Sequence, residues 1–225
     1  MPSSTTENYL KAIYALAERD TNSPLVRLGE LATELNLTPG TITTMIRSLS
    51  ERDLVIYQPR VGVKLTQKGK REALLVLRRH RLIELFLVEV MKMDWSEVHE
   101  DAEALEHAVS DKFLAKMDEM MGYPTEDPHG DPIPVAGADM PATKNRVLSD
   151  VEPGAYQLSR VNDQDPEFLA WLSASDLRPG TRLVVSSHDP HSGVLMLQLQ
   201  GAETEFPIGV EAAKKIRVKP VADNE

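Results

Sequence analysis

A segment rich in proline divides this 225-residue chain into two parts with different hydrophobic spacing. Five prolines lie between residues 124 and 141. Before them, apolar residues recur every three or four positions, which is the spacing of amphipathic helices. After them, short β-rich runs surround one helical stretch (166–174), which is typical of a small β-barrel or roll. These runs are 155–161, 181–188, 194–200 and 203–210. We therefore predict a mainly α chain with a small β domain.

The chain begins with a pattern of three predicted helices. They cover residues 3–19, 26–36 and 39–53, and Ser4 with Glu7 would form a capping box at the start of the first. A β-rich stretch follows around Pro59–Gly62 and predicts a hairpin. This order of elements is that of a winged helix-turn-helix, whose recognition helix enters the major groove of DNA.

The residues expected to contact DNA lie at the start of and along the third predicted helix, on the hairpin and just after the hairpin. Small hydroxyl side chains can approach base edges or phosphate, and basic side chains can meet phosphate. The expected residues are Thr38, Pro39, Gly40, Thr41, Thr43, Thr44 and Arg47, followed by Arg60, Lys64 and Lys68. A three-helix structural unit with solvated charges is the alternative interpretation of this region.

The charge of the chain changes along its length. The formal net charge is −10, and a strongly acidic protein repels phosphate. Residues 1–75, however, carry +2, whereas residues 76–145 carry −8 and residues 146–225 carry −4. Within the first block, residues 37–71 carry a net charge of +5. This distribution favours a basic DNA-binding face followed by an acidic part that binds cations.

The acidic part contains histidine and glutamate at helical spacing. If residues 95–109 form one helix, four of its histidine and glutamate side chains project within an arc of about 100°. These are His99, Glu103, Glu106 and His107, and the preceding predicted helix (66–93) adds His80 and Glu84. Two helices that each present histidine and glutamate suit a divalent cation, although a solvated helix face is the simpler alternative.

The available ligands limit the choice of metal. The chain has no cysteine, which excludes disulfides and thiolate sites. Oxygen and imidazole ligands suit Mn(II) or Fe(II), and Zn(II), Co(II) or Ni(II) would bind more tightly by intrinsic affinity and would substitute in vitro.

Several sequence motifs together resemble the diphtheria toxin repressor family of metal-dependent transcriptional regulators. They are TTENYLKAIYAL, LTPGTITTMIRSL, LTQKGK, HRLIELFL, VHEDAEALEHAVS and DPHGDPIP, and the similarity covers nearly the whole chain. The resemblance implies a winged helix-turn-helix domain at 1–72, a helical dimerisation and metal-binding domain at 73–145 with a linker from about 122, and an SH3-like domain at 146–225. It also implies a homodimer that binds a palindromic double-stranded DNA operator when loaded with metal.

The resemblance further implies two metal sites. The primary site would use Asn8, Glu103, Glu106 and His107, and the ancillary site would draw on His80, Glu84, His99, Asp127, His129, Asp165 and Glu167. Iron-responsive members place methionine and cysteine where this chain has Asn8 and Glu103, so the preference moves toward Mn(II). Lys11 stands where two-domain manganese regulators have an acid, which favours one ion in the primary site.

The sequence thus predicts a cytoplasmic repressor that senses Mn(II), with Fe(II) as the second choice. We expect no membrane segment, no secretory signal, no catalytic residues and no small organic substrate. The alternatives are a helical di-metal enzyme and a metal-buffering interaction module. The third domain would either support the ancillary site or bind a proline-rich segment such as 122–150.

Overall fold

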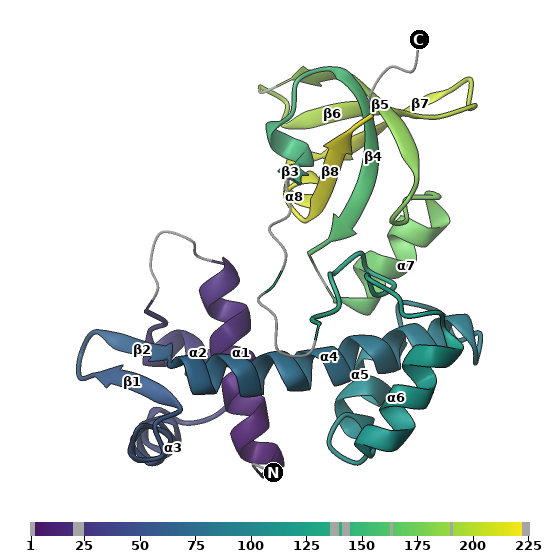
Figure 1. Ribbon diagram of the computed structural model, residues 1–225. Coiled ribbons are helices and arrows are strands. Elements are labelled where there is room, and N and C mark those ends of the chain that lie inside the picture. Colours follow the sequence, from purple (N-terminus) through teal and green to yellow (C-terminus); the bar gives the residue numbers. More distant parts are fainter. Residues whose placement is uncertain are drawn as a thin grey trace. The chain divides into compact units, whose positions relative to one another are not determined.

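A computed structural model describes residues 3–19, 25–135, 140, 145–162, 164–189 and 191–221 (Figure 1). They form two compact units. The first contains the described parts of segments 1–80, 106–109 and 134–139, and the second contains those of 81–105, 110–133 and 140–225. The boundary falls between His80 and Arg81, inside the long helix α4 (Gln67–Glu89). Within the described ranges, no helix is both long and apolar enough to cross a membrane.

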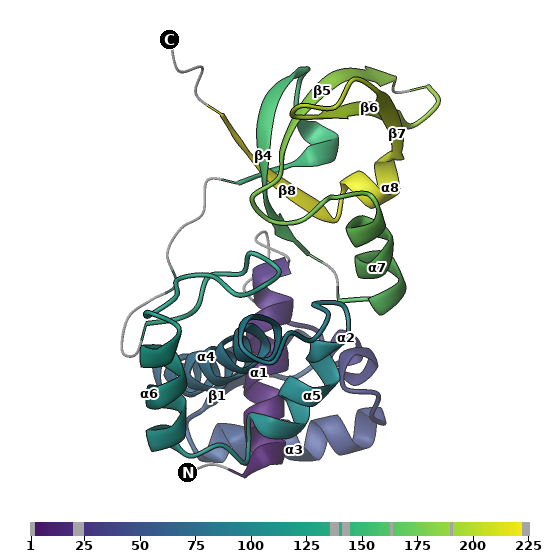
Figure 2. The ribbon, with the colours of Figure 1, turned by 90° about the vertical axis from the view of Figure 1, so that its right-hand side faces the viewer.

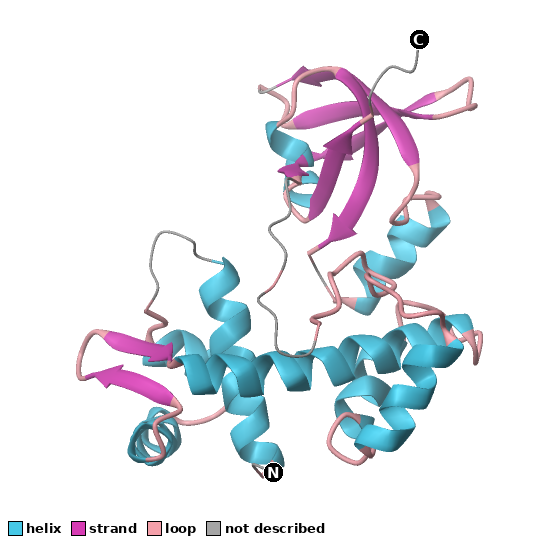
Figure 3. Ribbon diagram, in the orientation of Figure 1, coloured by secondary structure: helices cyan, strands magenta, loops and turns pink. Residues whose placement is uncertain are grey.

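The first unit begins with three helices and a hairpin, as the spacing predicts (Figure 3). They are α1 (Ser4–Arg19), α2 (Leu28–Glu34), α3 (Pro39–Glu51), β1 (Val55–Gln58) and β2 (Gly62–Leu65). The two strands are antiparallel, and Val26 forms a further bridge to Val63. Each helix buries apolar side chains, among them Leu10, Ile13, Leu31, Ile42, Ile46 and Leu49. The unit therefore has its own hydrophobic core.

Local contacts shape the beginnings of α3 and α4. The side chain of Thr38 accepts a hydrogen bond from the backbone nitrogen of Thr41 and caps α3, and Pro39 is the first helical residue, as predicted. At the start of α4, Gly69 approaches the hairpin closely. A Cβ there would lie 1.9 Å from the backbone oxygen of Leu54, so only glycine allows this contact.

The helices of the acidic part are shorter than the sequence predicts. The helix α4 ends at Glu89, α5 covers Val98–Leu105, and α6 covers Asp111–Met120. The prediction of one helix over 95–109 is therefore wrong, because residues 106–109 form a turn after α5. The predicted common arc does not include Glu106 and His107, whose side chains contact α1 and α4 from that turn.

The third domain is a curved six-stranded antiparallel sheet (Figure 2). Its strands are β3 (Arg146–Val147), β4 (Gly154–Val161), β5 (Arg182–Asp189), β6 (Val194–Leu199), β7 (Glu205–Gly209) and β8 (Ile216–Pro220), in the order β3-β8-β4-β5-β6-β7. The helix α7 (Pro166–Ala174) matches the predicted helical stretch. The sequence did not predict β3, β8 or the short helix α8 (Val210–Ala213), because each is brief and carries charged or weakly periodic residues.

Part of the predicted linker is a compact, buried turn. A bridge joins Glu126 to Pro132, and the backbone nitrogen of Asp127 donates to the backbone oxygen of Asp131. Asp127, His129 and Asp131 are all buried. We call residues 126–133 the 126–133 turn. Its polar side chains form part of the site described next.

Candidate metal centre

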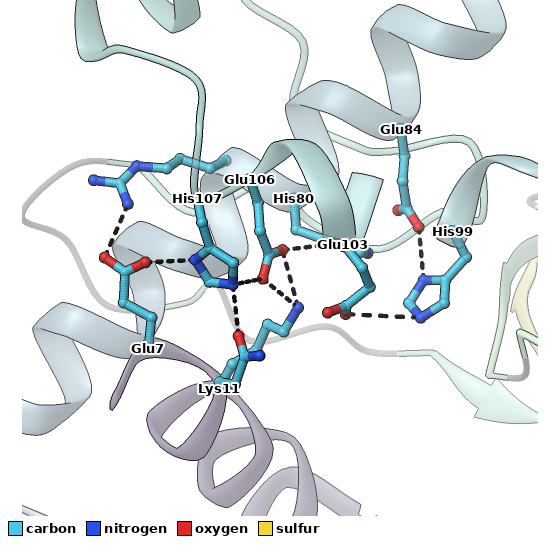
Figure 4. Close-up of polar contacts among 10 residues, drawn as sticks. Glu7, Lys11, His80, Glu84, His99, Glu103, Glu106 and His107 are labelled. Carbon is cyan, nitrogen blue, oxygen red and sulfur yellow. Dashed lines mark hydrogen bonds and ion pairs between the residues drawn. The ribbon is translucent and has the colours of Figure 1, made fainter. Parts of the chain in front are cut away.

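One set of candidate ligands lies in the first unit, and Figure 4 shows its contacts. Glu106, in the turn after α5, is fully buried. The Nζ atom of Lys11 donates to both of its oxygens, at 2.7 and 2.9 Å. Nδ1 of His80 lies 2.7 Å from Oε2 of Glu106. A buried carboxylate is thus held by α1 and by α4.

His107 follows Glu106 and joins the same turn to α1. Its Nε2 atom lies 2.6 Å from Oδ1 of Asn8 and 3.3 Å from Oε1 of Glu106. Its Nδ1 atom lies 2.6 Å from Oε2 of Glu7. The Nε2, Oδ1 and Oε1 atoms converge on one side of the imidazole ring. We call Asn8, Glu106 and His107 the Glu106–His107 group.

The electrostatics of this group favour a charged carboxylate. Burial raises the pKa of Glu106, but the hydrogen bonds and charges of His80 and Lys11 outweigh it and hold the pKa below its usual range. The group therefore offers an ionised oxygen, a neutral carbonyl oxygen and an imidazole nitrogen. Such ligands suit a hard or borderline divalent cation.

A second set of candidate ligands lies in the second unit. Glu84 on α4 meets Asp127 and His129 of the 126–133 turn, and one ligand atom from each lies within 4.8 Å of the others. All three residues are buried. We call them the Glu84–Asp127–His129 group. Nδ1 of His99 lies 3.2 Å from Oε1 of Glu84, and its Nε2 lies 3.8 Å from Glu103.

The ring of His129 is oriented toward Glu84. Its Nε2 atom donates to the backbone oxygen of Trp95 at 3.0 Å, and the two rings stack with centroids 5.3 Å apart. Nδ1 is buried, has no hydrogen-bond partner within the described part of the chain and lies 3.7 Å from Oε2 of Glu84. Two ligands bound about 2.1 Å from one ion are separated by about 3–4 Å, so this spacing fits a divalent cation.

The charges around this second set also favour a cation. Burial raises the pKa of Asp127 to about 7, and the carboxylates of Asp131 and Glu84 add to the shift. Burial lowers the pKa of His129, but the carboxylate of Glu84 outweighs it and raises this pKa to about 9. Without a metal, the protonated ring therefore compensates the charge of Glu84.

The 126–133 turn is held by an arginine from α4 and by its own backbone. Oδ1 of Asp127 accepts hydrogen bonds from the backbone nitrogens of His129 and Asp131. Arg81 donates to Asp131 at 3.0 Å and to the backbone oxygen of Pro132, and lies 3.6 Å from Asp127. These contacts fix the carboxylate of Asp127 beside Glu84.

The third domain contacts the same turn through strand β4. Arg160 lies 2.5 Å from Oδ1 of Asp131, and the backbone nitrogen of Val161 donates to the backbone oxygen of His129. Gly130 has φ +83°, and a Cβ there would lie 2.0 Å from the backbone oxygen of Ser159. The turn is therefore packed closely against β4.

The remaining predicted ligands lie elsewhere. Asp165 accepts a hydrogen bond from the backbone nitrogen of Glu167 and caps α7, and both residues are exposed. Among the described residues, no cluster of three metal-ligating side chains includes either of them. Glu103 lies in the second unit, and its contact with His99 is described above. The assignments of Glu103, Asp165 and Glu167 as ligands stay predictions.

The predicted DNA-contacting residues are largely exposed at the start of α3 and on the hairpin. Thr38, Pro39, Gly40, Thr41, Thr44, Arg47, Arg60 and Lys68 are exposed, and Thr43 and Lys64 are half-buried. The hydroxyls of Thr43 and Thr44 donate to the backbone oxygens of Pro39 and Gly40. These side chains therefore present methyl groups and oxygen lone pairs to a partner. Lys68 donates to the backbone oxygen of Arg52 at the end of α3.

One buried residue beside the ligands was not predicted as part of the site. Glu7 was assigned to a capping box with Ser4, yet Ser3 caps α1 by accepting from the backbone nitrogen of Thr6. The carboxylate of Glu7 instead contacts His107 and Arg79. An acid in the first turn of a helix is also favourable for the helix dipole, so its sequence position gave no signal for this role.

A helix-turn-helix followed by histidine and carboxylate groups defines a metal-dependent, DNA-binding regulator. Comparison with known proteins shows that the chain belongs to the family of iron-dependent repressors. The sequence model of the iron-dependent repressor N-terminal DNA-binding domain matches residues 1–63, and that of the metal-binding and dimerisation domain matches 66–135. A FeoA domain matches 146–220.

Individual relatives match over almost the whole chain. The iron-dependent repressor IdeR of Mycobacterium tuberculosis is 33% identical over 230 residues, covering 96% of this chain and 97% of the relative. The diphtheria toxin repressor of Corynebacterium diphtheriae is 26% identical over 214 residues, covering 90% and 92%. These relatives are repressors, so the family and its regulatory role are confirmed and the enzyme alternative is rejected.

Solved structures give the same result for the fold. A manganese-dependent transcriptional repressor in complex with manganese superposes with a TM-score of 0.87 at 34% identity, covering 96% of this chain and 100% of that one. ScaR with bound Zn²⁺ superposes with a TM-score of 0.78 at 31% identity, covering 98% and 100%. The predicted combination of a helical DNA-binding domain, a helical dimerisation domain and a small β domain is thus confirmed.

Proposed function

We propose that this protein is a repressor that responds to Mn(II), with Fe(II) as the second candidate, and controls genes of metal homeostasis. In this proposal it works in the cytoplasm as a homodimer on a palindromic operator. The manganese-dependent repressor with a TM-score of 0.87 supports Mn(II), and the similarity to IdeR supports Fe(II). The oxygen-rich ligand set favours the harder ion.

The proposed domains are 1–72, 73–145 with a linker from about 122, and 146–225. The matched ranges 1–63, 66–135 and 146–220 support this division, except that residues 66–72 fall in the second matched domain. The helix α4 begins at Gln67, so most of these residues lie on the helix that also carries His80 and Glu84.

The single observation that carries the proposal is the convergence of the Glu106–His107 group. Nε2 of His107, Oδ1 of Asn8 and Oε1 of Glu106 come from α1 and from the turn after α5. A divalent cation bound there would supply the positive charge that holds these oxygen and nitrogen atoms together. Asn8 would thereby fix α1, which packs against α2 and the hairpin, in one position relative to the turn.

This coupling explains how metal would control DNA binding. If all the ligands come together only in the conformation that binds DNA, the metal binds that conformation more tightly than the other. Metal binding then increases the population of the DNA-binding conformation. Asn8 lies on the helix that packs beside the helix-turn-helix, so the position of its side chain is coupled to the position of the DNA-reading face. Lys11, which holds Glu106 from the same helix, adds a charge that the bound cation must overcome.

The Glu84–Asp127–His129 group is the proposed ancillary site, with His99 as a further ligand. His80 was also expected there, and this stays a prediction. The contacts of Arg160 and Val161 with the 126–133 turn support the first of the two expected roles of the third domain, which is to support the ancillary site.

The test is DNA binding as a function of metal. Fragments bound in the presence of Mn(II) would be selected from random-sequence DNA, and their affinity measured with Mn(II), Fe(II), Zn(II) or a chelator. We expect tight binding with Mn(II) and a steep decrease with salt, because phosphate contacts release counterions. The variants Glu106→Gln and His107→Ala should lose the response to Mn(II), whereas Glu18→Gln, an exposed change on α1, should keep it.

Equal affinity with Mn(II) and with chelator would contradict the proposal. Binding that responds to Mn(II) equally well in His107→Ala would remove the Glu106–His107 group from the mechanism. A response to Fe(II) at lower free-metal concentration than to Mn(II) would keep the mechanism but make iron the effector.

A further inference from the structure

The imidazole ring of His107 lies between two oxygen acceptors that contact its opposite nitrogens. Oε2 of Glu7 lies 2.6 Å from Nδ1, and Oδ1 of Asn8 lies 2.6 Å from Nε2. The candidate ligand atoms of Asn8 and Glu106 are both on the Nε2 side. Glu7 is therefore close to the ring yet on the side away from the proposed ion (Figure 4).

Glu7 is itself held in place. Its side chain is 7% exposed, and its other oxygen, Oε1, accepts from Nη1 of Arg79 at 3.2 Å. Arg79 lies on α4, and its side chain is 12% exposed. A buried carboxylate with one oxygen bound by a guanidinium and the other aimed at a ring nitrogen has little freedom to turn. The three side chains form a chain of contacts from α4 through α1 to the turn after α5.

We propose that Glu7 is a positioning residue for the primary metal site. It accepts the Nδ1–H of His107, sets the ring orientation and tautomer, and so leaves Nε2 as the nitrogen that binds the cation. This inference rests on the proposed function of His107 as a metal ligand. Arg79 contributes by holding the carboxylate of Glu7 in the direction of the ring.

The contact between Glu7 and Nδ1 matters because a neutral imidazole ring has two tautomers. An imidazole that carries its proton on Nε2 cannot bind a metal through that atom, so the site would need a tautomer change at each binding event. A carboxylate beside Nδ1 stabilises the form with the proton on Nδ1 and raises the basicity of Nε2. When a ligating histidine loses such a hydrogen-bond partner, the metal affinity of the site typically falls about 10- to 100-fold.

The experiment compares three variants of the full-length protein. Glu7→Gln keeps the size of the side chain but removes the charge, Glu7→Ala removes the contact, and Glu18→Gln is the control. Glu18 is an exposed glutamate on the same helix. Thermal unfolding of each metal-free variant checks that the fold is kept, and Glu7→Gln is the informative variant if Glu7→Ala does not fold.

The first measurement is the tautomer of His107 in metal-free protein. Nitrogen-15 NMR at alkaline pH, where histidine rings are neutral, distinguishes protonated Nδ1 from protonated Nε2. His107→Gln assigns the signal. We expect protonated Nδ1 in the parent protein and in Glu18→Gln, and a shift toward protonated Nε2 in Glu7→Gln and further in Glu7→Ala. A merely structural role of Glu7 would leave the tautomer unchanged.

The second measurement is the affinity for Mn(II) alone, by titration calorimetry. We expect Glu7→Gln to lower the affinity of the primary site about 10-fold and Glu7→Ala up to about 100-fold. An unchanged tautomer in both Glu7 variants would overturn the proposal. Weaker Mn(II) binding with an unchanged tautomer would also overturn it, because Glu7 would then act as a ligand itself.

The two proposals fail in different ways. If His107→Ala binds Mn(II) like the parent protein, the primary site itself is wrongly assigned, whatever Glu7 does. If His107→Ala loses Mn(II) binding while Glu7→Gln and Glu7→Ala match Glu18→Gln, the site stands and only the role of Glu7 is wrong.

Discussion

The two ligand groups differ in how their negative charge is compensated. In the Glu106–His107 group, cationic side chains contact the acids directly, because Lys11 binds Glu106 and Arg79 binds Glu7. In the Glu84–Asp127–His129 group, Arg81 donates to Asp131 and lies 3.6 Å from Asp127, but burial and the carboxylates of Asp131 and Glu84 still raise the pKa of Asp127 to about 7. The acids of the first group are thus held by cationic side chains, whereas the second group contains closely spaced buried carboxylates that a bound cation would stabilise.

Their structural settings differ as well. The first group joins a helix of the DNA-binding domain to a short turn, so its occupancy can affect DNA binding. The second lies between α4 and the 126–133 turn, which the third domain contacts through Arg160 and Val161. We infer that the first group transmits the metal signal and that the second stabilises the fold around it. The first three predictions that follow test this contrast, from the largest expected effect to the smallest.

The largest effect is expected at Asp131, which supports the second group. Asp131→Ala leaves Arg81 and Arg160 without this buried carboxylate, which should lower the free energy of unfolding by about 3–5 kcal/mol. Denaturant unfolding of metal-free protein measures the loss. Asp101→Ala, at an exposed site on α5, is the control. Equal stability of the two variants would show that this ion-pair network contributes nothing.

Replacing one ligand in each group should separate their roles. Glu106→Gln should weaken Mn(II) binding to the first group about 100-fold, or about 2.7 kcal/mol, and abolish metal-dependent DNA binding. Asp127→Asn should remove one calorimetric binding event but leave part of the DNA response. If Asp127→Asn abolished the response and Glu106→Gln preserved it, the assignments of signalling and supporting group would be reversed.

Glycine at 130 should be needed for the packing of the second group. Gly130→Ala introduces a Cβ 2.0 Å from the oxygen of Ser159 at positive φ, and we expect a loss of about 2–3 kcal/mol in stability. Gly122 also has positive φ but has open space around it, so Gly122→Ala should cost only about 1 kcal/mol. Thermal unfolding compares the two. A larger loss in Gly122→Ala would disprove the close packing of the turn against β4.

The smallest effect concerns Asp94, a carboxylate outside both groups. Hydrogen bonds from Ser96 lower the pKa of Asp94, so its contribution to stability is present at neutral pH and is lost as the pH falls through the lowered value. Its side chain is 46% exposed, so the contribution should stay below about 1 kcal/mol. Ser96→Ala should reduce the stability at pH 7 and leave it nearly unchanged in strong acid, as measured by denaturant unfolding. A difference of equal size at both pH values would show that Ser96 acts through packing instead.

The elements of the DNA-binding region could be predicted because local signals and tertiary packing agree. The capping of α3 by Thr38, the proline at its first position and the hairpin around residues 59–62 all follow from local chemistry. The strand β8 has no such signal, since it is short, carries two charged residues and is recognisable only by its pairing with β3 and β4. The third domain was therefore predicted by its class rather than by its strand order.

The site was predicted less completely for a physical reason. Residues 106–107 lie outside the helical geometry. Their side chains contact α1, 95–100 positions earlier in the chain, and α4, and the helical spacing cannot reveal this. The resemblance indicated Asn8 and the buried turn. Glu7 was missed because an acid in the first helical turn is ordinary, and only its distance to Nδ1 of His107 distinguishes it from a cap.

The contact between β4 and the 126–133 turn has a consequence for biosynthesis. Domains form during translation from the N-terminus onward, so Asn8, Glu106 and His107 are all available once the chain has been made to residue 109. Asp131 and the backbone oxygen of His129 can form their contacts with Arg160 and Val161 only after about thirty further residues have been made. The nascent protein can thus bring the Glu106–His107 group together before the support for the Glu84–Asp127–His129 group has left the ribosome.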